Sequence, residues 1–272
     1  MIKLIASDID GTLLRNGNRK IPEEIFEHIL RLKDMGILFA AASGRQYRSM
    51  RDLFAPVADE ILYLCENGAI VYRDDAILAK IPMPRQEALD IIHQIQAVED
   101  CEVLISGANT SYLMPKHEDY LDHIRYFVGN HVTLIERAED IKEDILKVSA
   151  YCRSGAAGYD KPMGDSWRAL GFQAAVAGLK WLDCALADKA AGMRALCRAL
   201  EVSADEVMAF GDNFNDLSML QVAGRPYIIT GCPLDAAGYA SSGIGFGADG
   251  CTKTFARTES VEAVLRGVGE KV

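Results

Sequence analysis

Two acidic residues, Asp8 and Asp10, directly follow an apolar run near the N-terminus, in the stretch KLIASDIDGTLL. Carboxylates are normally excluded from such positions because burying an unpaired charge costs free energy. In extended chain, residues two positions apart project to the same side, so both carboxylates can face one bound group. Alone, the pair could equally form a helix cap and a turn. As reactive groups, one could attack an electrophile while the other transfers protons.

Further residues capable of chemistry follow apolar runs later in the chain. Ser43 and Gly44 come after ILFAAA, and the polar residues of GDNFND come after VMAF. Lys189 lies near the start of DKAAGMRALCRAL, which has a helical pattern. Reactive groups gather at the carboxyl ends of the strands in open parallel sheets. We therefore expect one site at a sheet edge, formed by Asp8, Asp10, Ser43, Gly44, Lys189, Asp212, Asn215 and Asp216.

The elements that must position these residues alternate between strand and helix. Apolar runs predict strands over residues 3–7 and 37–42, and a helix within 21–36 separates them. Residues 60–72 indicate two strands around an Asn-Gly turn. Near-continuous apolar strands alternating with helices are typical of a parallel sheet covered on both faces. The predicted fold class is α/β, with a Rossmann-like parallel sheet as the core.

The pattern changes after the segment KIPMPRQ. A helix over residues 86–97 is followed by short strands in CEVLIS, SYLMP, KVSAYCR and GFQAAVAG, with HEDYLDHIRYFVG helical between them. These strands indicate an antiparallel sheet, and the first pattern resumes near residue 186. The sequence therefore predicts a discontinuous core, residues 1–82 and 183–272, with an inserted α+β domain over 83–182.

Length, charge and cysteine content limit the classes to which the protein can belong. The chain has 272 residues and a formal net charge of −10 at pH 7, which argues against nucleic acid as a partner. No apolar stretch approaches the roughly 18 residues that span a bilayer, and the N-terminus lacks a signal-peptide layout. The seven cysteines include no CxxC pair, which favours buried, reduced thiols. We expect a cytoplasmic enzyme that does not associate with membranes.

Together, the four groups of residues resemble the haloacid dehalogenase (HAD) superfamily of phosphohydrolases. DIDGTL matches its first motif, SGR its second, the helix-opening Lys189 its third and GDNFND its fourth. The GDxxND form, the ENGA stretch and the large insertion between the second and third motifs resemble the Cof-type branch with a type IIB cap. The resemblance implies that the insertion is this cap and that the protein hydrolyses phosphate monoesters.

The resemblance also implies roles for the acids. Asp8 is expected to attack phosphorus and form an aspartyl-phosphate, and Asp10 to protonate the leaving oxygen and then activate water. The implied cofactor is Mg²⁺, which suits oxygen ligands and a phosphate substrate. Its expected ligands are Asp8, Asp212 and the backbone carbonyl of Asp10, with Asp216 acting directly or through water.

The transferring phosphoryl group needs donors and cations placed in advance. Ser43 offers a hydroxyl, and Lys189 offers a positive charge at a helix N-terminus. Gly44 allows backbone N–H groups to approach closely. Thr12 and Asn215 are expected to hold the phosphate or to orient their neighbours.

We expect a Mg²⁺-dependent phosphatase of a small phosphorylated metabolite: a sugar phosphate, pyridoxal phosphate, flavin mononucleotide or a nucleotide. The alternatives are a sugar phosphomutase and a non-catalytic phosphate- or Mg²⁺-binding module. GFGADG formally matches the dinucleotide-binding GxGxxG, but no strand precedes it and no βαβ unit follows. GFGADG and TGCP also stand where Cof-type chains usually carry asparagines, which leaves the contacts of those asparagines without a counterpart.

Overall fold

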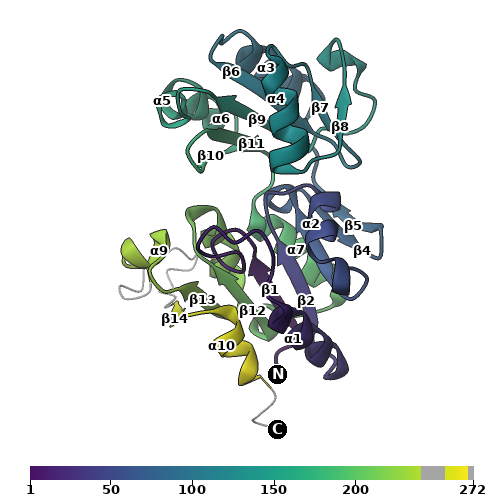
Figure 1. Ribbon diagram of the computed structural model, residues 1–272, viewed down its shortest axis with the longest axis vertical. Helices are drawn as coiled ribbons and strands as arrows, with labels where there is room; N and C mark the ends of the chain where they lie inside the picture. Colours follow the sequence, from purple (N-terminus) through teal and green to yellow (C-terminus); the bar gives the residue numbers. More distant parts are fainter. Residues whose placement is uncertain (240–254, 269–272) are drawn as a thin grey trace. The chain divides into compact units, whose positions relative to one another are not determined.

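The structure is a computed structural model that describes residues 1–239 and 255–268. It divides into two compact units (Figure 1). Unit 1 comprises Met1–Gly44, Met50–Ala79 and Lys189–Val272, and unit 2 comprises Arg45–Ser49 and Lys80–Asp188. The predicted insertion, 83–182, differs from unit 2 by a few residues at each end. The C-terminal difference arises because the last strand of the second sheet, Trp181–Ala185, continues past residue 182.

Unit 1 is built on an eight-stranded sheet in the order β14-β13-β12-β1-β2-β3-β4-β5. From β14 to β3, neighbouring strands are parallel, and β4 runs antiparallel to β3. This arrangement confirms the predicted α/β class and the predicted hairpin. The strands are β1 (Leu4–Asp8), β2 (Leu38–Ala42), β3 (Leu62–Cys65), β4 (Ile70–Arg73), β5 (Ala76–Lys80), β12 (Val207–Gly211), β13 (Arg225–Ile229) and β14 (Ala256–Thr258).

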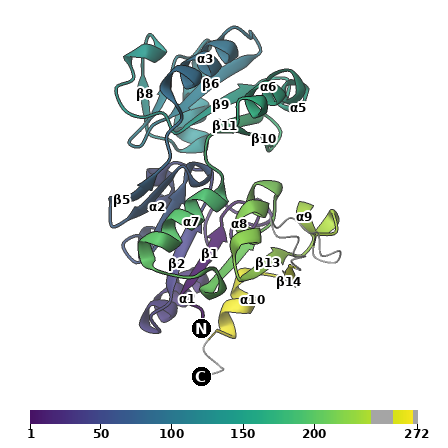
Figure 2. The same cartoon turned by 180° about the vertical axis from the view of Figure 1, so that it is seen from behind.

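Helices cover both faces of this sheet. α1 and α10 lie on the face turned toward the viewer in Figure 1, and α7 and α8 lie on the face seen in Figure 2. The helices outside unit 2 are α1 (Glu23–Asp34), α7 (Lys189–Leu200), α8 (Leu217–Val222), α9 (Pro233–Ala236) and α10 (Val261–Arg266), and α2 (Tyr47–Leu53) begins in unit 2 and ends in unit 1.

The local sequence explains where α1 begins and ends. Pro22 precedes its first turn, which carries two glutamates that favour the positive end of the helix dipole. Ile25, Ile29 and Leu32 recur at helical spacing and are buried against the sheet side. Gly36 has a φ of +73°, a left-handed conformation that ends the helix and that glycine adopts without strain.

Unit 2 is built on a six-stranded sheet in the order β10-β11-β9-β6-β7-β8. Its strands are antiparallel as predicted, with one exception, because β8 runs parallel to β7. The exception follows from the helical connection between them, which returns the chain to the end where β7 began. The strands are β6 (Cys101–Ser106), β7 (Ser111–Leu113), β8 (Val132–Leu134), β9 (Lys147–Cys152), β10 (Gln173–Ala177) and β11 (Trp181–Ala185).

The sheet of unit 2 has apolar side chains on both faces. One face packs on α3 and α6 in a large cluster that includes Ile92 and Trp167. The other face packs Leu104 and Leu113 against Tyr120 and its neighbours. The helices of this unit are α3 (Arg85–Gln96), α4 (Glu118–Asp122), α5 (Ala157–Tyr159) and α6 (Asp165–Ala169). Within residues 1–239 and 255–268, no helix combines the length and apolar character needed to cross a bilayer.

Candidate active site

The predicted carboxylates meet at the carboxyl edge of the core sheet. Asp8 is the last residue of β1 and is 4% exposed. β1 pairs with β12 in parallel, with Ser7 opposite Phe210, so the two strands end at the same edge. Asp212 directly follows β12 and is also buried. The apolar, fully buried β1 and β12 therefore deliver one acid each to the same place.

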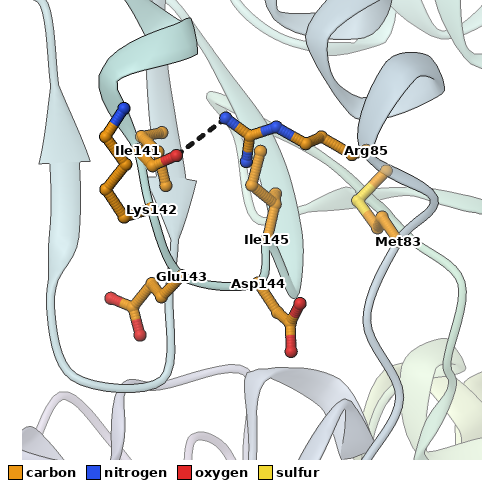
Figure 3. Close-up of a pocket in the computed structure, with 7 residues that line it drawn as sticks. All are labelled: Met83, Arg85, Ile141, Lys142, Glu143, Asp144 and Ile145. Carbon is orange, nitrogen blue, oxygen red and sulfur yellow. Dashed lines mark hydrogen bonds between the residues drawn. The ribbon is translucent and has the colours of Figure 1, made fainter.

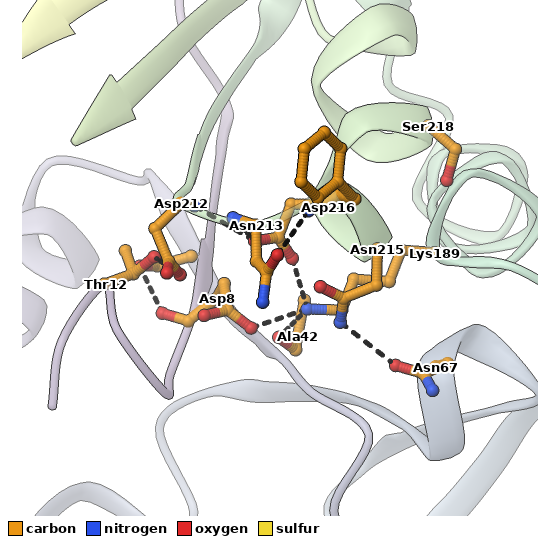
Figure 4. A network of polar contacts seen from close by, with 12 residues as sticks. Asp8, Thr12, Ala42, Asn67, Lys189, Asp212, Asn213, Asn215, Asp216 and Ser218 are labelled. Carbon is orange, nitrogen blue, oxygen red and sulfur yellow. Dashed lines mark hydrogen bonds and ion pairs between the residues drawn. The ribbon is translucent and has the colours of Figure 1, made fainter. Parts of the chain in front are cut away.

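Lys189 links these acids from the first turn of α7. Its side chain is fully buried, and its Nζ donates to Asp8 Oδ1 at 2.5 Å and to Asp216 Oδ1 at 2.5 Å. A third bond from Nζ goes to the backbone carbonyl of Ala42 at 3.0 Å. Figure 4 shows the lysine side chain ending between the two carboxylates. The ammonium group thus has three acceptors at the edge where β1 and β2 end.

The loop after β12 places Asp216. The turn Phe214–Asp216 is a short 3₁₀-helix, and Asp216 Oδ2 accepts from the backbone N–H groups of Asp212 and Asn213, each at 3.0 Å. This reciprocal capping turns Asp216 back toward β12. A Cβ on Gly211 would lie 2.5 Å from the Asp216 Cβ, so only glycine fits there. The Asp216 carboxylate is therefore held by the backbone of its own loop.

The loop after β1 holds Asp212 from the other side. Thr12 Oγ1 donates to Asp212 Oδ1 at 3.0 Å. Gly11 has a φ of +99°, and a Cβ there would lie 2.2 Å from Asp212 Oδ2. The backbone of residue 11 therefore lies directly against this carboxylate, which explains the glycine of the DIDGTL motif.

Burial and mutual repulsion set the charges in this cluster. Burial raises the pKa of Asp8, the nearby Asp216 carboxylate raises it further, and Lys189 acts in the opposite direction. The pKa of Asp212 is raised by the same two causes, burial and Asp216. For Lys189, burial alone would lower the pKa, but Asp216 and Asp8 outweigh it and the pKa is raised. One ammonium group does not neutralise three carboxylates, so the cluster favours a further cation.

The donor set fits a divalent metal ion. One ligand oxygen from each of Asp8, Asp212 and Asp216 lies within 4.8 Å of the others. Asp8 Oδ2 is buried and has no hydrogen-bond partner among the described residues. A buried carboxylate oxygen without a donor is costly unless a ligand completes it. Carboxylate oxygens without sulfur or nitrogen ligands suit hard cations such as Mg²⁺.

Asn67 connects Ser43, Gly44 and Asn215. Motif spacing did not predict Asn67 as a site residue. The backbone N–H of Asn67 donates to the Ser43 carbonyl at 3.0 Å, and its side-chain oxygen accepts from Asn215 Nδ2 at 3.5 Å. A Cβ on Gly44 would lie 3.1 Å from the Asn67 side chain. Asn67 belongs to ENGA, and three successive positive φ angles over Glu66–Gly68 turn it back toward the SGR loop.

Asp10 lies in the loop after β1, and its side chain is exposed. The loop is compact, because the backbone N–H groups of Leu13 and Leu14 both donate to the Ile9 carbonyl. The N–H of Gly11 donates to the Leu14 carbonyl. The structure thus gives the two acids of DIDGTL different surroundings. Asp8 is enclosed, whereas Asp10 is exposed.

Two other features bear on candidate sites. The GFGADG segment, residues 245–250, lies outside the described residues. A surface pocket in unit 2 is lined by Met83, Arg85 and residues 141–145 (Figure 3). There Arg85 donates to the Ile141 carbonyl at 2.7 Å, and none of the predicted site residues lines the pocket.

Comparisons with known proteins agree with this geometry. Residues 5–164 and 183–231 match the sequence model of the haloacid dehalogenase-like hydrolases. The chain is 26% identical over 230 residues to 5-amino-6-(5-phospho-D-ribitylamino)uracil phosphatase YbjI of Escherichia coli, with 82% of this chain and 83% of the relative covered. It is 27% identical to pyridoxal phosphate phosphatase YbhA of Escherichia coli, covering 82% and 85%. The fold resembles the HAD subclass IIB sugar phosphatase BT4131, with a TM-score of 0.78 at 17% identity over 98% and 99% of the two chains.

Proposed function

Since the chain belongs to the haloacid dehalogenase-like hydrolases and is a phosphatase of the Cof-type branch, we propose that it is Mg²⁺-dependent and works through an aspartyl-phosphate on Asp8. The proposed substrate is a phosphate monoester of a small metabolite. The observation that carries the proposal is Asp8 itself, a buried carboxylate with one oxygen bound to Lys189 and the other without a hydrogen-bond partner among the described residues.

The two acids of DIDGTL divide the reaction into two displacements. In the first, an oxygen of Asp8 forms a bond to phosphorus while the bond to the leaving oxygen breaks, and Asp10 gives its proton to that oxygen. In the second, the Asp10 carboxylate removes a proton from water, whose oxygen attacks the phosphorus. Inorganic phosphate leaves and the Asp8 carboxylate is restored. The exposure of Asp10 supports this role, because the carboxyl group must reach both the leaving oxygen and the attacking water.

Asp8, Asp212, Asp216 and the Asp10 carbonyl would hold the metal. A bound Mg²⁺ supplies positive charge that offsets the three carboxylates and the oxygens of the transferring phosphoryl group. The chain's own residues hold the acids in place for this, through Thr12 on Asp212 and backbone N–H groups on Asp216.

The phosphate oxygens need donors that are fixed before the substrate arrives. We assign the donors to Ser43, the backbone at Gly44 and Asn215. Lys189, whose three N–H groups already have acceptors, contributes its positive charge, and Thr12, whose hydroxyl donates to Asp212, orients that carboxylate. Lys189 is fixed by three acceptors, and Asn215 by Asn67, so neither has to be ordered during the reaction. Asn67 is a positioning residue for the loop that carries Ser43.

The substrate class follows from the relatives. Those named above act on 5-amino-6-(5-phospho-D-ribitylamino)uracil and on pyridoxal phosphate, both small phosphorylated metabolites. We propose the same class here, comprising sugar phosphates, pyridoxal phosphate, flavin mononucleotide and nucleotides. Phosphate release from a panel of such compounds, measured as kcat/KM, identifies the preferred member.

The nucleophile is tested by Asp8→Asn, which keeps the shape of the side chain but removes its charge. We expect Mg²⁺-dependent hydrolysis of p-nitrophenyl phosphate to fall by about 10³-fold or more, because the covalent step is lost. Asp34→Asn, an exposed acid at the end of α1, is the matched control and keeps wild-type activity. Wild-type turnover in Asp8→Asn would contradict the assignment.

A further inference from the structure

Two buried cysteines of unit 2 face each other across neighbouring strands. Cys101 begins β6 and Cys152 ends β9, and they lie directly opposite in the antiparallel register. Their Sγ atoms are 3.3 Å apart, and both side chains are fully buried. They are 51 positions apart in sequence, so no local cysteine motif indicates that they form a pair.

The backbone geometry at this pair suits a covalent link. The N–H of Cys101 donates to the Val98 carbonyl and that of Cys152 to the Lys180 carbonyl, so the two residues do not bond to each other through the backbone. Cα atoms of such non-hydrogen-bonded pairs lie about 4.5 Å apart. Disulfides span Cα separations of about 4.4–6.8 Å, so the strands need little movement to accept one.

We propose that Cys101 and Cys152 are a redox-responsive thiol pair, which hydrogen peroxide converts to a cross-strand disulfide. The thiolate of one cysteine attacks a peroxide oxygen and becomes a sulfenic acid, and the other peroxide oxygen leaves as hydroxide, which is protonated to water. The second thiol then attacks the sulfenic sulfur, and the sulfenic oxygen leaves as a second water. Two thiols are oxidised, one peroxide is reduced, and a dithiol reductant reverses the change.

The surroundings favour Cys101 as the first thiol to react. The contact between the two thiols lowers the pKa of Cys101, while the same contact and burial raise the pKa of Cys152. The Lys116 ammonium group lies beside this end of β6, where it donates to the Cys101 carbonyl at 2.8 Å. Reactive thiols are the ones that are stabilised as thiolates.

The disulfide would close a ring of chain from residue 101 to residue 152. This ring contains α4 and four of the six strands of the unit 2 sheet, namely β6, β7, β8 and β9. A cross-link over a long loop stabilises chiefly by restricting the unfolded chain. Oxidation is thus expected to stabilise unit 2.

The test is to treat the full-length protein with hydrogen peroxide, remove the peroxide with catalase, denature, alkylate the remaining thiols and measure the intact mass. We expect two fewer alkylated cysteines than in the untreated protein and a cross-linked peptide joining Cys101 to Cys152. Dithiothreitol restores both thiols. The melting temperature is expected to rise by several degrees on oxidation and to return on reduction.

Variants separate this pair from general oxidation. Cys184→Ser is the matched control, since Cys184 is buried in the same apolar cluster and lies opposite Val148 in the sheet. This variant keeps the cross-link, whereas Cys101→Ala and Cys152→Ala lose it. A full set of alkylated cysteines after peroxide treatment, or cysteine sulfinic acid without a cross-linked peptide, overturns the proposal.

Discussion

At the scale of single residues, the site depends on a balance between Lys189 and the acids around it. Motif order was enough to predict Asp8, Lys189, Asp212 and Asp216, because each follows a strand or opens a helix, and the structure places them together. Asn67 was not predicted as a site residue. Its position depends on a left-handed backbone stretch after β3, and its contacts are to residues far away in sequence.

Lys189→Met tests this balance. Removing the ammonium group leaves Asp8 and Asp216 buried without their cation, which costs about 3–5 kcal/mol of unfolding free energy when one partner of a buried pair is lost. Urea unfolding in the absence of Mg²⁺ measures this loss. Lys161→Met, at an exposed position of unit 2, is expected to change stability by less than about 0.5 kcal/mol. Equal stability of the two variants would show that Lys189 is dispensable for the fold.

Gly11→Ala tests the close approach of the backbone to Asp212. The new methyl group overlaps Asp212 Oδ2, so the carboxylate must move, and we expect the Mg²⁺ concentration for half-maximal activity to rise by about 10–100-fold. Gly17→Ala is the matched control, since Gly17 also has a positive φ but no atom within 4 Å of the added carbon. If both variants respond alike, backbone strain and not the overlap with Asp212 is responsible.

At the scale of elements, an ion pair links the starts of β1 and β12, at the opposite end of the strands from the site. Ser203 and Glu206 form a capping box around the short 3₁₀-helix Ala204–Glu206, directly before β12, and Lys3 Nζ lies 2.8 Å from Glu206 Oε1. The Lys3 side-chain bond comes first among the causes that lower the pKa of Glu206 to about 2, and the Ser203 backbone N–H adds to it. The strands that deliver Asp8 and Asp212 are therefore held in register partly by an ionised glutamate.

The variant Glu206→Gln tests this contribution through the pH dependence of thermal stability. The folded pKa of Glu206 is about 2 and its ordinary value is 4.5, so its stabilising contribution is present above about pH 4.5 and is lost as the pH falls toward 2. We expect the variant to melt at a lower temperature than the wild type at pH 7 and at the same temperature near pH 2. A difference in melting temperature that persists unchanged to acid pH would contradict the assignment.

The sequence predicted most core elements but fewer of those in unit 2. Strong periodicity identified α1, α3 and α7, and apolar runs identified β1, β2 and β12. β8 and β11 were not predicted. β8 has only three residues, and β11 contains the charged Asp183, so its place is decided by pairing with β9 and β10. The glycine-rich segment before β10 holds the short helices α5 and α6. Tyr159 of α5 and Trp167 of α6 pack in the apolar cluster of unit 2, and this packing outweighs the weak local pattern.

At the scale of the whole molecule, the net charge of the protein repels its proposed substrate, because both are negative. The chain carries a formal net charge of −10, and its proposed substrate is a phosphate anion. Salt screens the overall repulsion over about 10 Å at 0.1 M, but it affects the buried Lys189 much less.

We therefore expect kcat/KM to rise by about two- to five-fold between roughly 0.01 M and 0.15 M monovalent salt, through a lower KM, with free Mg²⁺ held constant. Steady-state kinetics with p-nitrophenyl phosphate measure this change. A fall in kcat/KM with added salt would mean that the cations near the site dominate the approach of the substrate.

The pairing of β1 with β12 also has a consequence in time. Leu4 lies opposite Val207, so the strand made first is completed by one made about two hundred residues later. At about 5–20 residues per second, roughly 10–40 s of synthesis separate the two strands. When β12 is made, all the strands of the unit 2 sheet have already been synthesised, whereas β1 has until then lacked its β12 neighbour. The inserted domain is therefore the part of the chain that can fold first, and the catalytic edge is among the last features to form.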